Sequence, residues 1–94
     1  MSGPIPSVRC SATADGWICT VALGRDAGEH EVTVDRATLE DLAPGATPEA
    51  LIEESFRFLL EREPPDAILR RFPLPIIGRY FADYPDEIRR RLAG

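Results

Sequence analysis

Residues 56–84 read FRFLLEREPPDAILRRFPLPIIGRYFADY and hold six of the seven aromatic side chains of this 94-residue chain. Bulky aliphatic side chains are also dense in this stretch, with arginines between them. A domain of this size has to keep most such side chains away from water, either in its own core or against a partner. The stretch therefore predicts where the core lies, and it leaves the function open.

Helical spacing predicts short helices within this stretch and on both sides of it. Thr47 is expected to cap a helix from Pro48 to Glu63, because its apolar residues recur every three or four positions. The paired prolines that follow it, and two more at positions 73 and 75, predict breaks. The remaining helices are expected over residues 36–42, capped by Asp35, and over 65–72, 76–81 and 84–92.

Apolar and polar residues alternate from Val8 to Val34, a period typical of strands with one buried face. Asp15-Gly16 and residues 24–28 supply turn chemistry. The sequence predicts a three-stranded antiparallel meander followed by four or five short helices packed on one face, an α+β fold. A second turn centred between Asp26 and Ala27 would place Val21 opposite Val32, Leu23 opposite His30 and Cys19 opposite Val34, with Trp17 buried on the same face.

Composition and charge narrow the classes of partner. The chain is 44% hydrophobic and 29% charged, which favours one globular domain over residues 8–94 behind a flexible lead-in of residues 1–7. No apolar run is long enough to span a membrane and no leader pattern opens the chain, so a cytoplasmic location is expected. The net charge of −5 argues against nucleic acid and membrane surfaces as partners. All eleven basic residues are arginine, which suggests the codon usage of a high-GC bacterium.

Cys10, Cys19 and His30 fall on the predicted inner face of the meander, and the two cysteines are candidate cross-strand neighbours. A metal site or a Cys-His pair could be built from these three residues, and a disulfide from the cysteines. Reduced cysteines that pack in the core are the interpretation we favour, because cysteine is among the most buried residue types. For His30, the only histidine, we favour a capping or strand-end role.

No catalytic motif accompanies the many carboxylates. Most of them lie on predicted solvated helix faces with an arginine three or four residues away, as in Glu53 and Arg57. A phosphate loop, a zinc-protease motif and a Ser-His-Asp arrangement are absent from the sequence. We therefore predict a protein that is not an enzyme and carries no cofactor.

The apolar residues of 76–81 would cover too wide an arc of a helix for one narrow contact. Part of that arc is expected to pack on the preceding long helix, and the rest to face outward. An exposed aromatic beside an arginine has the composition of interface hot spots. We predict a partner-binding patch, most simply for a homodimer, from Arg79, Tyr80, Phe81, Arg70 and Arg71.

For Arg70, Arg71 and Arg79 as a group, the interpretation we favour over this patch is that they act within the molecule. They would then stack on Phe72 or Tyr80 and pair with the acids of residues 61–66.

Residues 30–63, HEVTVDRATLEDLAPGATPEALIEESFRFLLERE, resemble in layout a ribbon-helix-helix domain, and HicB-type antitoxins resemble the N-terminal two-thirds more closely. Such domains form intertwined dimers whose paired strands read the DNA major groove. The resemblance implies a DNA-binding regulator or antitoxin. Against it, the outward strand positions are Glu31, Thr33 and Asp35, and acidic side chains repel phosphates.

The pattern FxFLLEREP…IL…F…IxRYF between residues 56 and 81 is similar to that of small uncharacterised bacterial proteins, and it implies no activity. The leading interpretation is a non-enzymatic protein-interaction or regulatory module. A ribbon-helix-helix-like regulator is the first alternative, and a small metal-binding or enzymatic protein using Cys10, Cys19 and His30 is the second.

Overall fold

The fold contains one four-stranded sheet, seen in a computed structural model that describes residues 6–24 and 28–93. The sheet order is β1-β2-β3-β4. The first three strands form the expected antiparallel meander, and the fourth is parallel to β3. The strands are β1 (Ser7–Ala12), β2 (Gly16–Ala22), β3 (Glu29–Asp35) and β4 (Arg71–Pro73).

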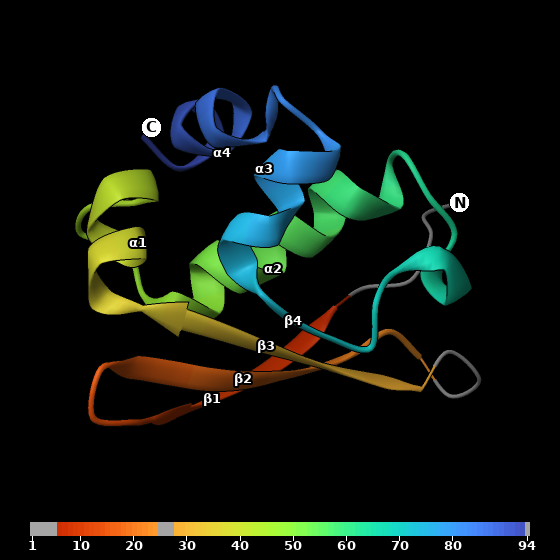
Figure 1. Ribbon diagram of the computed structural model, residues 1–94, viewed down its shortest axis with the longest axis horizontal. Helices are drawn as coiled ribbons and strands as arrows, with labels where there is room; N and C mark the ends of the chain where they lie inside the picture. Colours follow the sequence, from red (N-terminus) through yellow and green to blue (C-terminus); the bar gives the residue numbers. More distant parts are fainter. Residues whose placement is uncertain (1–5, 25–27, 94) are drawn as a thin grey trace.

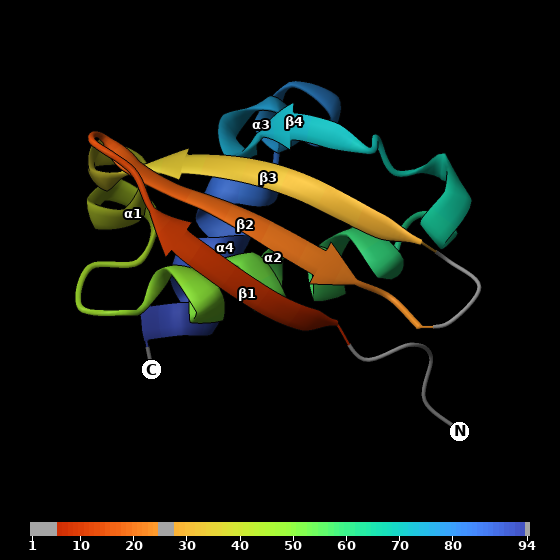
Figure 2. The ribbon, with the colours of Figure 1, turned by 90° about the horizontal axis from the view of Figure 1, so that it is seen from below.

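The helices lie together on one face of this sheet (Figure 1), and the view from below shows the strands uncovered on their other face (Figure 2). This two-layer arrangement confirms the expected placement of the helices on a single face. Besides two 3-10 turns, η1 (Pro65–Ala67) and η2 (Leu74–Ile76), the helical elements are α1 (Arg36–Leu42), α2 (Pro48–Leu60), α3 (Ile77–Tyr80) and α4 (Tyr84–Ala93).

The expected register of β2 and β3 is wrong by two residues. Val21 pairs with His30, and Cys19 with Val32. A shift of two leaves the same side chains on the same face, so a period-two pattern cannot distinguish the two registers. The residues proposed for the centre of that turn, Asp26 and Ala27, lie outside the described residues, as does most of the expected lead-in.

The fourth strand is a correction to the predicted three-stranded sheet. Instead of a helix over 65–72, the chain makes the turn η1 and then extends, so that Phe72 lies opposite Val32. Pro73 disfavours the helical conformation for the residue before it, which favours extension at Phe72. The Glu31 amide donates to the Arg70 carbonyl at 2.7 Å and adds to the pairing.

Both predicted helix caps are confirmed. The Thr38 amide donates to the Asp35 carboxylate at 2.8 Å, and the Ala50 amide donates to the Thr47 hydroxyl at 3.1 Å. These side chains satisfy amides that the first helical turn leaves without partners. The helix that Thr47 caps ends at Leu60, three residues before the predicted Glu63.

The core forms between the inner sheet face and the helices, and Phe56, Phe58, Leu51 and Ile52 of α2 are completely buried in it. Trp17, which we expected to be buried, is only half-buried. It stands next to the β1–β2 turn, and the Arg36 guanidinium lies 5.3 Å from its ring centroid and covers part of it. A cation over the ring replaces part of the apolar burial expected there.

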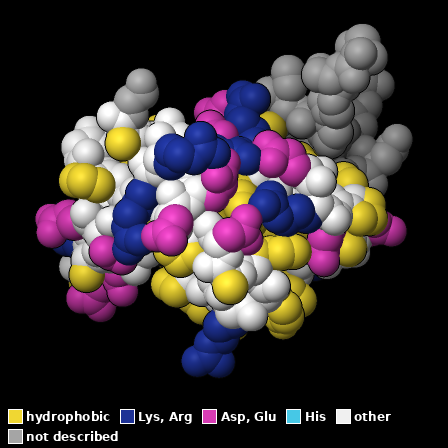
Figure 3. Space-filling view, turned by 90° about the horizontal axis from the view of Figure 1, so that it is seen from above, with side chains coloured by type: hydrophobic (Ala, Val, Ile, Leu, Met, Phe, Trp, Pro, Cys, Tyr) yellow, Lys and Arg dark blue, Asp and Glu magenta, His cyan; other side chains and the backbone are white. Residues whose placement is uncertain are grey.

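Charged side chains join α4 to α2. Arg91 pairs with Glu54 and Glu61 of the α2 segment at 3.1 and 2.7 Å, and with Glu87 of its own helix at 2.7 Å. Arg90 also pairs with Glu87, at 2.6 Å. Figure 3 shows acidic and basic side chains interspersed over the helical side of the molecule.

Glu87 should make stability depend on pH in the acid range. Hydrogen bonds from Arg90, and then from Arg91, lower the pKa of Glu87 from 4.5 to about 2 in the folded protein. Its stabilising contribution is therefore present above pH 4.5 and is lost as the pH falls toward 2. Glu87→Gln should lower the urea midpoint at neutral pH, and the difference from the unsubstituted protein should shrink on acidification.

The matched control is Glu40→Gln, because Glu40 is exposed and has no ion-pair partner among the described residues. A difference between Glu87→Gln and the unsubstituted protein that is independent of pH would contradict the assignment.

Candidate interaction cleft

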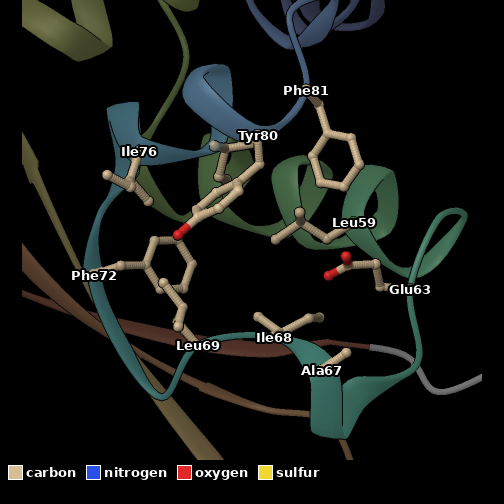
Figure 4. Close-up of a pocket in the computed structure, with 10 residues that line it drawn as sticks. Leu59, Glu63, Ala67, Ile68, Leu69, Phe72, Ile76, Tyr80 and Phe81 are labelled. Carbon is tan, nitrogen blue, oxygen red and sulfur yellow. The ribbon is translucent and has the colours of Figure 1, made fainter.

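An apolar cleft with a volume of about 180 Å³ opens between the end of α2, the η1 turn and α3. Figure 4 shows its lining residues arranged around the opening, with Tyr80 and Phe81 on the side of α3 and Ile68 and Leu69 on the opposite side. We refer to it as the cleft. Its lining is Leu59, Glu63, Ala67, Ile68, Leu69, Phe72, Ile76, Ile77, Tyr80 and Phe81.

The cleft is bordered by large hydrophobic side chains that water can reach. Among the described residues, three such side chains are exposed: Tyr80 at 67%, Leu69 at 48% and Ile18 at 40%. Two of the three, Tyr80 and Leu69, belong to this one cleft. Single exposed hydrophobic residues are ordinary, but two beside a concave apolar surface are typical of a binding site.

The short α3 helix separates a buried side from an exposed one, as the sequence predicted. Ile77 is buried, and Phe81, just after the helix, packs edge-on against Phe58 of α2 with ring centroids 5.9 Å apart. Tyr80 stays 67% exposed, and Figure 4 shows its ring extending from α3 along the cleft toward Phe72.

His30 fixes the position of Leu69, on the side of the cleft opposite α3. Its Nδ1–H donates to the Leu69 carbonyl at 2.8 Å, and its ring packs against Phe56 at 5.6 Å between centroids. His30 lies at the start of β3, the strand-end position that we expected, and at 1% exposure it is also a core residue. Nε2 is buried with no hydrogen-bond partner among the described residues.

One charged group, Glu63, lines the otherwise apolar cleft. No described residue forms an ion pair with its carboxylate. The neighbouring Arg62 does not neutralise it, because that guanidinium lies 3.7 Å from the Phe58 ring centroid and pairs with Asp83 at 2.7 Å. The cleft therefore presents a negative charge beside apolar surface.

The structure divides the predicted partner-binding residues into two groups. Tyr80 and Phe81 line the cleft, and Arg79 lies beside them on α3 without lining it. Arg70 and Arg71 are exposed but line no part of the cleft, and Arg71 is the β4 partner of Glu31 in the sheet.

The expected stacking of these arginines on Phe72 or Tyr80 is not observed among the described residues. Near the cleft, the Arg62 guanidinium lies over Phe58 and, at 5.8 Å from the ring centroid, over Phe81. Sequence reasoning missed Leu69 and Glu63 as parts of the site. Both lay in predicted helix, where nothing showed that they would meet α3.

Cys10 and Cys19 are directly opposite one another in β1 and β2, as expected, and they form a disulfide. The expectation of reduced cysteines is therefore wrong. A sulfur in a disulfide is no longer the thiolate that binds metal or attacks a substrate. No group of three or more possible metal ligands occurs within residues 6–24 and 28–93, and His30 pairs across the sheet with Val21.

No helix in the described part of the chain is long and apolar enough to cross a membrane. No family model, no curated protein and no solved structure matches the chain.

Proposed function

We propose that this protein is a non-enzymatic interaction module that binds a protein partner in the cleft. The observation that carries the proposal is the pairing of two water-exposed hydrophobic side chains, Leu69 and Tyr80, with one concave apolar surface. Tyrosine, phenylalanine and arginine are enriched in interfaces, and hot spots cluster where such side chains enter pockets. Tyr80, Phe81 and Arg79 supply this composition.

The chemistry of the lining favours binding over catalysis. Its polar side chains are the carboxylate of Glu63 and the phenol of Tyr80, and the other lining residues are aliphatic or aromatic. General acid–base catalysis needs a positioned proton donor and acceptor, and nucleophilic catalysis needs an activated nucleophile with its base. The cleft therefore suits a partner that inserts a bulky apolar side chain and places a positively charged group next to it, where that group can pair with the Glu63 carboxylate.

The ribbon-helix-helix alternative has support from the order of elements, because β3, α1 and α2 follow one another as in that family. DNA reading in such dimers needs an unoccupied strand edge for the partner's strand. Here β3 pairs with β2 along its length and with β4 at residues 31–33. Glu29, Glu31 and Asp35 are also acidic, which favours the interaction module.

A cytoplasmic location stays a prediction from the sequence, and the disulfide is the observation against it. Disulfides persist mainly in oxidising compartments. Determining the redox state of Cys10 and Cys19 in the source cell, by alkylation before lysis, would decide between a cytoplasmic and an exported module.

Site-specific photo-crosslinking tests the proposed function. A photoreactive phenylalanine analogue in place of Tyr80 should give a protein adduct in cells of the source organism. The same analogue in place of Glu40, an exposed residue of α1 that does not line the cleft, is the control. Ala67→Trp, which fills the cleft, should abolish the adduct at position 80 while thermal unfolding shows an intact fold.

The absence of any Tyr80-specific protein adduct, or an adduct that persists when the cleft is filled, would contradict the proposal.

A further inference from the structure

We infer that the cleft binds a second copy of this chain in a two-fold symmetric dimer, in which Arg79 of each copy pairs with Glu63 of the other. The inference rests on the proposed function and names the partner. It follows from a complementarity between the cleft and α3, the helix that borders it.

The charge that the cleft requires is present beside its own rim. Glu63 lines the cleft, and Arg79 is exposed one residue before Tyr80. Neither forms an ion pair within the described part of one copy. By contrast, Arg62, next to Glu63 in the sequence, is engaged with Asp83. Arg70 and Arg71, next to the cleft residues Leu69 and Phe72, also form no ion pair among the described residues, but only Arg79 is directly followed by the exposed Tyr80.

The apolar anchor is present on the same helix. Tyr80 is 67% exposed and follows Arg79 directly, so the pair presents the aromatic group and the positive charge that the cleft suits. Ile76, at the end of η2, is three residues before Arg79 in α3, and residues three apart on a helix are neighbours on its surface. Arg79 therefore lies next to the cleft residues Ile76 and Tyr80. A bound copy would bring these groups together to the cleft.

Two-fold symmetry makes both halves of the contact at once. In such an interface, if residue i of one copy contacts residue j of the other, then j also contacts i. The anchor and the cleft are adjacent here, because Tyr80 belongs to both. One dimer would therefore cover two exposed tyrosines, two exposed leucines and two unpaired carboxylates, and no open-ended assembly is needed.

Charge reversal and mixing test this pairing on the purified protein by sedimentation velocity. The unsubstituted chain should show a concentration-dependent monomer–dimer equilibrium. Arg79→Glu and Glu63→Arg should each weaken the dimer by at least about tenfold, because each places like charges together twice. The two variants mixed in equal amounts should dimerise again, because the mixed dimer has opposite charges at both contacts.

Arg9→Glu is the control, since Arg9 is an exposed residue of β1 outside the cleft, and it should leave dimerisation unchanged. Thermal unfolding of every variant excludes misfolding as the cause. A strictly monomeric protein at millimolar concentration would overturn the inference, as would single variants that associate like the unsubstituted chain or a mixture that stays monomeric.

These outcomes are separable from failure of the proposed function. A monomeric protein whose Tyr80 crosslinks specifically to a different protein would retain the function and remove the self-association. A monomer without a Tyr80-specific adduct would remove both.

Discussion

Replacing Tyr84 by alanine is expected to lower the free energy of unfolding by about 3–5 kcal/mol, the cost of truncating a large buried aromatic side chain. Tyr84 is 1% exposed at the start of α4, and its ring packs edge-on against Phe58 at 5.3 Å between centroids. Its hydroxyl donates to Ser55 at 2.7 Å, and Ser55 in turn donates to the Leu51 carbonyl. The substitution would remove both the packing and the hydrogen bond that hold α4 on α2. Urea unfolding measures the loss.

Tyr84→Phe is the matched control because it keeps the ring and removes the hydroxyl. It should cost only about 1–2 kcal/mol, the usual range for a buried hydrogen-bond partner. Burial raises the pKa of Tyr84, an effect that the Ser55 hydrogen bond partly opposes. The folded state therefore prefers the neutral phenol, and stability should fall as the pH rises above 10, a loss that Tyr84→Phe removes. An alanine variant no less stable than the phenylalanine variant would contradict this account.

Removing the disulfide should lower stability by about 2–3 kcal/mol, because the link closes only a short loop of the unfolded chain. Cys10 and Cys19 are nine residues apart and join the edge strand β1 to β2. The double substitution to alanine is the variant to make, since it leaves no free thiol. Urea unfolding of this variant beside the oxidised protein measures the difference, and the reduced parent separates the covalent link from packing.

The reduced parent should lose about as much stability as the alanine variant. If the alanine variant loses this stability but the reduced parent does not, the loss comes from the smaller side chains and not from the missing disulfide.

The elements that the sequence predicted correctly are those specified by neighbouring residues. Asp35 and Thr47 cap helices through side chains that act three residues away, so their signals are local. The alternation from Val8 to Val34 likewise identified the faces of the first three strands. It could not identify the register, because pairings that differ by two residues bury the same side chains.

The parts that sequence reasoning missed depend on distant residues. Phe72 joins the sheet beside Val32, forty residues earlier, and a parallel pairing has no turn that would announce it. The disulfide was undervalued because the expected compartment was taken as the guide to cysteine chemistry. Sequence reasoning did identify Tyr80. The apolar residues of 76–81 cover too wide an arc of a helix for all of them to be buried, so some of them have to be exposed to water. Glu63 and Leu69 become part of the cleft only because β4 brings the segment between α2 and β4 close to α3.

The late position of β4 has a consequence for biosynthesis. A chain synthesised only as far as Leu69 contains the three-stranded meander and α2, but it has neither the fourth strand nor α3. Contacts between segments far apart in sequence form late because closing a long loop costs entropy before any contact repays it. The cleft should therefore form only when most of the last third of the polypeptide has been synthesised, because its lining extends to Phe81. Nascent chains on neighbouring ribosomes would be protected from premature association until each one is nearly complete.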